Sequence, residues 1–252
     1  MSNATYEGMP VPQCYQDLED VLNTGVDRVI LYGPPGTGKT FSGLTLGVDS
    51  EVGSERLICS EDMTNADVSG AVMPNEKGGF EFNFGAALRA WLGNGVKGSR
   101  LVIDEIDKAG GDVFATLLAF LDSVASASFS HPFTGEKYRP LPGFSAIMTT
   151  NIEDPDELPM ALKDRFPVAI KIDAPHPAAL MELPVELRQL AATIVAGRPG
   201  QRASLRAFYA FETLHKGGMH VERAARMTFG HMADDILSAV SIGTLTPEFS
   251  LA

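Results

Sequence analysis

Residues 28–40 read RVILYGPPGTGKT and constrain the fold of the chain more than any other stretch. RVILY is a short, nearly continuous apolar run, which is typical of a parallel strand covered on both faces. GPPGTGKT fits the pattern G-x-x-x-x-G-K-[ST], and helix-forming sequence follows it, as the pattern requires. Its glycines let the backbone turn tightly, so that successive N–H groups and a helix N-terminus face one centre of negative charge. The stretch therefore predicts a strand, a phosphate-binding loop and a helix.

This phosphate-binding loop also predicts which cofactors the chain binds. The ammonium of Lys39 reaches the β- and γ-phosphates of a nucleotide, and the hydroxyl of Thr40 ligates magnesium. We therefore expect ATP and Mg²⁺ as cofactors. The residues expected to contact the nucleotide from this stretch are Gly33, Pro34, Pro35, Gly36, Thr37, Gly38, Lys39, Thr40 and Phe41.

Strands alternate with helices over the first two thirds of the chain. Besides RVILY, the predicted strands are residues 55–60, 100–104, 144–150 and 168–172. Helical stretches lie between them, since residues such as Phe114, Leu117, Leu118 and Leu121 recur at helical spacing. This alternation predicts an α/β fold, a doubly wound parallel sheet of five strands, in which ligands bind at the carboxyl ends of the strands.

The strand pattern ends at DAPHPAAL, residues 173–180. The sequence beyond it predicts three or four helices, at about 183–196, 203–215, 219–228 and 231–240. We therefore expect two domains, an α/β nucleotide-binding domain at residues 1–174 and a small helical lid domain at residues 175–252.

The segment LVIDEIDKAG, residues 101–110, supplies the second half of the predicted site. Asp104 ends an apolar strand, so its carboxylate should lie beside the phosphate loop and hold the magnesium shell. Glu105 follows directly, and a second carboxylate there can orient and deprotonate the attacking water as general base. Asn151 follows another strand, where its amide can place that water against the γ-phosphate. Asp107 and Lys108 are interpreted as solvated or ion-paired features of a helix start.

With these residues, the chain resembles the AAA+ ATPases, and within them the MoxR-like group. The motifs that carry the resemblance are GPPGTGKT, LVIDEIDKA, TTN and DELPMALKDRF, which ends at Phe166, and it covers about residues 20–170. It implies that Asn151 is the sensor 1 residue and that Arg165 acts as an arginine finger in a neighbouring subunit. A finger supplied in this way raises the rate by roughly 10³–10⁵. The resemblance thus implies a homo-oligomeric ring, with six subunits expected.

The resemblance extends less closely to the predicted lid. GQRASLRAF, residues 200–208, is similar to the family segment that bears the sensor 2 arginine. This likeness selects Arg202 for contact with the nucleotide, with Arg206 as the alternative one helical turn further on.

Two stretches have the pattern of β-hairpins, and the resemblance implies both, one within the second helix and one before sensor 1. In MPNEKGGFEFNFG, residues 73–85, Gly78 and Gly79 predict a two-residue turn with positive φ, and FEFNF is the return strand. Its three phenylalanines are expected to hold the hairpin to its own domain, and its tip to contact a partner. Residues 128–143 form the second predicted hairpin, where Lys137 and Arg139 add local positive charge.

Composition excludes several other classes of protein. The net charge is −12, and from residue 175 on there are seven basic and seven acidic residues, so the first 174 residues carry the whole excess. Non-specific binding to nucleic acid is therefore disfavoured. No apolar run approaches the roughly 18 residues of a membrane helix, and the N-terminus lacks the pattern of an export signal. We expect a cytoplasmic protein without a membrane partner, in which Cys59, at the end of the apolar run LICS, is a small buried hydrophobe.

Three functions remain open from the sequence. The first is Mg²⁺-dependent ATP hydrolysis by a ring that remodels or activates a protein substrate or adaptor, for which the resemblance suggests a von Willebrand-type domain. The second is a motor subunit that acts on nucleic acid, of a restriction or DNA-processing type, favoured by the basic second hairpin and opposed by the net charge. The third is a nucleotide-gated scaffold without turnover, which the presence of Glu105 opposes.

Overall fold

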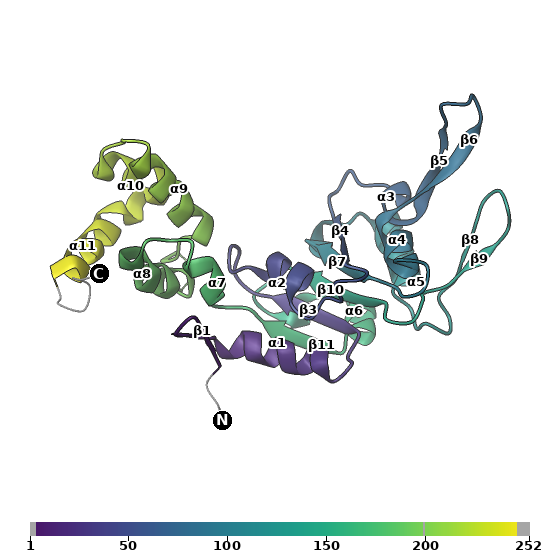
Figure 1. The fold of residues 1–252 in the computed structure, drawn as a ribbon, viewed down its shortest axis with the longest axis horizontal. Coiled ribbons are helices and arrows are strands. Elements are labelled where there is room, and N and C mark those ends of the chain that lie inside the picture. The colour runs from purple at the N-terminus through teal and green to yellow at the C-terminus, as the bar shows by residue number, and fades with distance from the viewer. Residues whose placement is uncertain (1–3, 199, 246–252) are drawn as a thin grey trace. The chain divides into compact units, whose positions relative to one another are not determined.

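The computed structural model describes residues 4–198 and 200–245 and divides the chain into two compact units (Figure 1). The sheet unit comprises Leu18–Gly33 and Lys39–Lys171. The helical unit comprises the chain up to Asp17, the loop Pro34–Gly38 and the chain from Ile172 on. The predicted division at residues 174 and 175 stays a prediction.

The sheet unit is built on five parallel strands in the order β11-β3-β10-β7-β4. The strands are β3 (Arg28–Tyr32), β4 (Ser54–Ile58), β7 (Arg100–Asp104), β10 (Ser145–Thr149) and β11 (Val168–Lys171). Each lies within two residues of a strand predicted from the apolar runs. The predicted doubly wound α/β fold is therefore confirmed, and the carboxyl ends of β3, β10, β7 and β4 lie along one edge of the sheet.

Helices cover both faces of this sheet. On one face, Ile30, Ile103 and Met148 join a core with the helices α4 (Ala86–Leu92) and α5 (Gly111–Phe120). On the other face lies α2 (Lys39–Thr45), where Gly43 packs so closely that an added Cβ would lie 3.3 Å from side-chain carbons of both Val102 and Ile147. The other helices with residues in this unit are α1 (Gln13–Asn23), which begins in the helical unit, α3 (Asn65–Ser69), α6 (Met160–Arg165) and the 3₁₀ turns η1 (Ile106–Lys108) and η2 (Pro155–Glu157).

The carboxyl end of α2 is capped by a buried arginine from the sheet. Arg100, at the start of β7, donates to the carbonyls of Gly43 at 3.2 Å and Gly47 at 2.9 Å, and also to that of Leu46. Burial lowers the pKa of this guanidinium to about 10, so it stays charged at neutral pH. A cation at this end of the helix complements the helix dipole and fixes α2 against the sheet.

Two hairpins extend from the sheet unit and pack against each other (Figure 1). The first pairs β5 (Gly70–Pro74) with β6 (Phe80–Phe84), and the second pairs β8 (Phe129–Ser130) with β9 (Lys137–Tyr138). Both predicted hairpins are therefore present. The predicted two-residue turn is wrong, because Asn75–Gly79 form a five-residue loop, and of the two glycines only Gly78 has a positive φ. Asn75 stabilises this loop by accepting from the N–H groups of Lys77 and Gly79.

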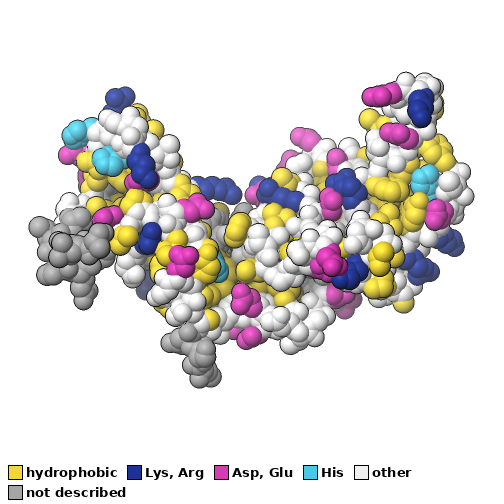
Figure 2. Space-filling view, in the orientation of Figure 1, with side chains coloured by type: hydrophobic (Ala, Val, Ile, Leu, Met, Phe, Trp, Pro, Cys, Tyr) yellow, Lys and Arg dark blue, Asp and Glu magenta, His cyan; other side chains and the backbone are white. Residues whose placement is uncertain are grey.

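Aromatic rings join the two hairpins. Phe82 stacks on Phe129 at 5.8 Å and meets the edge of His131 at 5.2 Å, and Phe84 meets Tyr138 at 5.6 Å between ring centroids. Phe82 and Phe84 thus act as the expected anchors. Phe80 is 67% exposed, which contradicts its expected anchoring role, and Figure 2 shows apolar side chains along the projecting hairpins with charged ones at the tip.

The helical unit has its own apolar core. Its helices are α7 (Pro177–Leu180), α8 (Val185–Val195), α9 (Leu205–Lys216), α10 (Val221–Phe229) and α11 (Ala233–Leu245), with the 3₁₀ turn η3 (Gly230–Met232) and the short strands β1 (Thr5–Tyr6) and β2 (Met9–Pro10). Phe208, Phe211 and Phe229 pack ring against ring inside it. In the part of the chain that the structure describes, no helix combines the length and the apolar character needed to cross a membrane.

We predict that Arg100→Met destabilises the protein by about 2–4 kcal/mol, because three hydrogen bonds to the end of α2 are lost inside the protein. Urea unfolding measures this change. Arg89→Met is the matched control, since Arg89 forms an exposed ion pair with Glu55 at 2.9 Å, and its loss should cost under about 1 kcal/mol. Equal effects of the two substitutions would contradict the capping role of Arg100.

Candidate active site

The carboxylate of Asp104 lies at the centre of a group of polar side chains at the carboxyl edge of the sheet. Thr40, in the first turn of α2, donates to its Oδ1 at 2.7 Å, and Thr149, at the end of β10, donates to the same oxygen. Arg56, on β4, donates to Oδ2 and forms an ion pair with the carboxylate. Side chains from three neighbouring elements therefore converge on one buried anion.

Two opposing effects set the charge state of Asp104. Burial raises the pKa of its carboxyl, and the hydrogen bonds from Thr149, Arg56 and Thr40 outweigh burial and bring the pKa below its usual value. Asp104 is thus ionised at neutral pH. Its oxygens and the Thr40 hydroxyl are hard donors, which are the ligands that Mg²⁺ prefers, so these two residues fit the metal role predicted for them.

Lys39 connects the phosphate loop to the end of β10. Its ammonium donates to the carbonyl of Gly33 at 2.9 Å and to the amide oxygen of Asn151 at 3.0 Å. The structure thus brings together two residues that lie 112 positions apart in the sequence. The pair places one positive charge and one amide side by side at the edge of the sheet, where the sequence predicts the γ-phosphate and the attacking water.

Glu105 has a strained backbone. Its φ is 58° and its ψ is 45°, the left-handed region that residues other than glycine seldom adopt. The ammonium of Lys108 donates to the carboxylate of Glu105 at 2.7 Å, and this hydrogen bond raises the pKa of the Lys108 ammonium. Asp107 accepts from the hydroxyl of Thr150 at 2.8 Å. The predicted ion-paired role is confirmed for Lys108, and such strain directly after a strand is typical of functional sites.

The phosphate loop has the backbone that its glycines predict, with positive φ at Gly33, Gly36 and Gly38. Within the helical unit, a residue that the sequence analysis missed supports this loop. Tyr15 is fully buried, and its hydroxyl donates to the carbonyl of Thr37 at 2.7 Å and lies 3.1 Å from that of Ala174. No motif marks this tyrosine, because the contact joins residues that are distant in sequence.

The other residues predicted to act at the site are Arg165, Arg202 and Phe41. Arg165 donates to the carbonyls of Leu118 and Ala161, at 3.0 and 3.1 Å, within the sheet unit. Arg202 precedes α9 in the helical unit. Phe41, in the first turn of α2, is 57% exposed. Their predicted roles stay predictions.

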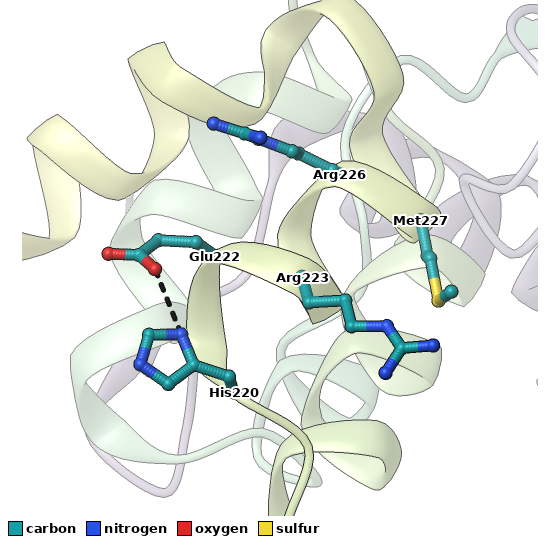
Figure 3. Close-up of a pocket in the computed structure, with 5 residues that line it drawn as sticks. All are labelled: His220, Glu222, Arg223, Arg226 and Met227. Carbon is teal, nitrogen blue, oxygen red and sulfur yellow. Dashed lines mark ion pairs between the residues drawn. The ribbon is translucent and has the colours of Figure 1, made fainter.

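A separate pocket lies on the helical unit (Figure 3). It is lined by His220, Glu222, Arg223, Arg226 and Met227, all on α10 or directly before it, with His220 and Glu222 paired at 2.8 Å. It contains none of the predicted site residues.

A family model matches residues 28–166, more than half of the chain, and is described as the AAA domain of the dynein-related subfamily. The chain belongs to this family. By family it is an AAA+ ATPase, as the resemblance drawn from the sequence predicts, and its place within the MoxR-like group stays a prediction. Membership of this family implies that the chain binds a nucleotide.

Similarity to other known proteins adds little to this AAA+ assignment. No curated protein matches the chain. Among solved structures, a candidate ATPase from Cytophaga hutchinsonii ATCC 33406 is 22% identical, with a TM-score of 0.45. The match covers 68% of this chain and 49% of that one, so it spans about half the length of its relative.

We predict that Glu105→Gln lowers the rate of ATP hydrolysis at least about 100-fold, because the amide cannot accept a proton from the attacking water. ATP affinity should stay within about threefold of the original value, since the charge of Lys39 and the loop backbone are unchanged. Steady-state phosphate release and calorimetric titration measure the two quantities. Asp107→Asn is the control on a neighbouring carboxylate, and an equal loss of rate there would contradict the assignment of Glu105.

Proposed function

We propose that the chain hydrolyses Mg²⁺-ATP at the edge of its sheet and works as a ring that remodels or activates a protein partner. The observation that carries the proposal is the group formed by Thr40, Asp104, Lys39 and Asn151, with Glu105 next to it in a strained conformation. This group contains two oxygens suited to a metal, a cation for the phosphates and a carboxylate for the water.

Each side chain of the group has a role set by its chemistry. Thr40 and Asp104 would hold Mg²⁺, which when bound neutralises charge on the phosphates. Lys39 binds the β- and γ-phosphates, and Asn151 orients the attacking water by its amide. Glu105 takes the proton from that water once its carboxylate leaves Lys108. Because Lys108 is exposed, the ion pair between the two is weak enough to open.

The ring is proposed from the position of Arg165. Two of its nitrogens donate to backbone carbonyls of α6 and the end of α5, which fixes a half-buried guanidinium at the surface of the sheet unit. A fixed guanidinium of this kind suits a finger that reaches the nucleotide of a neighbouring subunit. Six subunits and a contact from Arg202 to the nucleotide are part of the proposal.

The partner is proposed to bind at the tip of the first hairpin. Glu76 and Lys77 are exposed and do not contribute to a hydrophobic core. The aromatic contacts of Phe82 and Phe84 at the other end of the hairpin hold it in place. A protein partner suits the net charge of −12 better than nucleic acid does. A von Willebrand-type domain on the partner and a cytoplasmic location remain part of the proposal.

We predict that mixing two inactive variants restores hydrolysis. Arg165→Ala keeps Glu105 and lacks the finger, whereas Glu105→Gln keeps the finger and lacks the base. In an equimolar mixed ring about a quarter of the interfaces join an intact base to an intact finger, so about a quarter of the original activity should return. Phosphate release measures the recovery, and light scattering with ATP measures the mass of the ring. Mixed rings that stay inactive would contradict action in trans.

We predict that replacing Glu76 and Lys77 together by alanine spares basal hydrolysis and weakens capture of the partner. Capture is measured by placing the change in the Glu105→Gln protein, which should retain its partner with ATP and Mg²⁺, and quantifying the retained chain by mass spectrometry. The control replaces Glu51 and Lys97, a surface ion pair at 3.1 Å, with the same change in charge. Loss of basal hydrolysis with the fold intact would contradict the separation of tip and site.

A further inference from the structure

Arg56 is the one cation of the Asp104 group that the sequence analysis did not select. It lies on the edge strand β4, where Arg56 pairs in register with Val102 and Ile58 pairs with Asp104. Arg56 thus lies level with Val102, two residues before Asp104. Its side chain extends along the neighbouring strand, and the guanidinium donates to Oδ2 of Asp104. The side chain of Arg56 is 43% exposed, whereas that of Asp104 is 9% exposed.

The contacts of Asp104 divide between its two oxygens. Thr40 and Thr149 donate to Oδ1, and Arg56 donates to Oδ2. A divalent cation held by Asp104 and Thr40 would bind the negative charge of the Asp104 carboxylate, which forms an ion pair with Arg56. At the short distances of such a group, two cations repel each other strongly, so the guanidinium and the metal compete for one anion.

Arg56 differs from the buried arginines of the same sheet in how easily it can leave. Arg100 is 7% exposed and is held by three backbone carbonyls, and Arg28 is 6% exposed. Arg56, by contrast, is exposed on an edge strand, and its guanidinium donates a hydrogen bond to the carboxylate of Asp104. Solvent can hydrate the released guanidinium, so Arg56 can leave once another cation compensates the charge of Asp104.

We propose that Arg56 is a displaceable counter-ion of Asp104 that lets the nucleotide bind before the metal and sets the metal affinity of the site. This inference rests on the proposed binding of Mg²⁺-ATP at this site. Before the metal arrives, Arg56 cancels the negative charge of Asp104, which would otherwise repel the triphosphate. With a metal held by Asp104 and Thr40, the Arg56 side chain would turn to solvent.

The proposal is tested by the binding of AMP-PNP, a non-hydrolysable ATP analogue, measured by calorimetry in EDTA and in saturating Mn²⁺. The Kd in EDTA divided by the Kd in Mn²⁺ reports how much the metal strengthens nucleotide binding. In Arg56→Gln the uncompensated Asp104 should weaken binding in EDTA about fivefold, while binding with Mn²⁺ stays equal or becomes tighter. The Kd in EDTA divided by the Kd in Mn²⁺ should therefore rise at least about fivefold. A rise of this kind cannot come from a general loss of folding, which weakens binding in both conditions.

Two further variants make the test specific. Arg56→Lys keeps the charge and should return the ratio to within about twofold of the original. Arg89→Gln removes the same charge from the ion pair with Glu55, also on β4, and should leave the ratio unchanged. An unchanged ratio in Arg56→Gln, or equal weakening in EDTA and Mn²⁺, would overturn the role of Arg56. Absence of AMP-PNP binding by the unmodified protein in both conditions would instead overturn the proposed function itself.

Discussion

The buried charge of Asp104 is the constraint on which the rest of the site depends. A carboxylate taken out of water needs partners, and here they come from α2, β10 and β4. Because these elements must meet at one point, the strand order β3-β10-β7-β4 and the close packing of α2 on Val102 and Ile147 follow as requirements of the site. The fold therefore holds Thr40 and Asp104 together by their own hydrogen bond, without a ligand.

The same edge of the sheet separates rigid parts from parts that can move. Lys39, Thr149 and Asp104 are buried, whereas Glu105 is half-buried, and the cations paired with the two carboxylates, Lys108 and Arg56, are exposed. Each carboxylate thus sits on a fixed backbone and is paired with a cation whose side chain is open to solvent. This arrangement suits a site that must exchange its contacts during a cycle of nucleotide binding, hydrolysis and release.

Sequence patterns predicted the parts of the structure that depend on local chemistry. The five strands, the glycine-rich loop and both hairpins follow from apolar runs and turn residues, and the meeting of Lys39 with Asn151 agrees with the strand-end rule. Tyr15 and Arg56 were missed because their contacts join distant residues without a motif. The hairpin turn was predicted wrongly because the side chain of Asn75 stabilises a longer loop. The predicted roles of Arg165 and Arg202 stay predictions, because they involve a neighbouring subunit and a bound nucleotide.

The central claim is that Asp104 and Thr40 hold the metal of a nucleotide site. The most direct measurement is electron paramagnetic resonance of Mn²⁺ with protein in excess over AMP-PNP, comparing the unmodified chain with Asp104→Asn. This change keeps the shape of the side chain and removes its charge. The account predicts that the metal affinity of the complex falls at least about tenfold while AMP-PNP still binds in EDTA. Mn²⁺ binding that is unchanged in Asp104→Asn, with the fold intact, would contradict it.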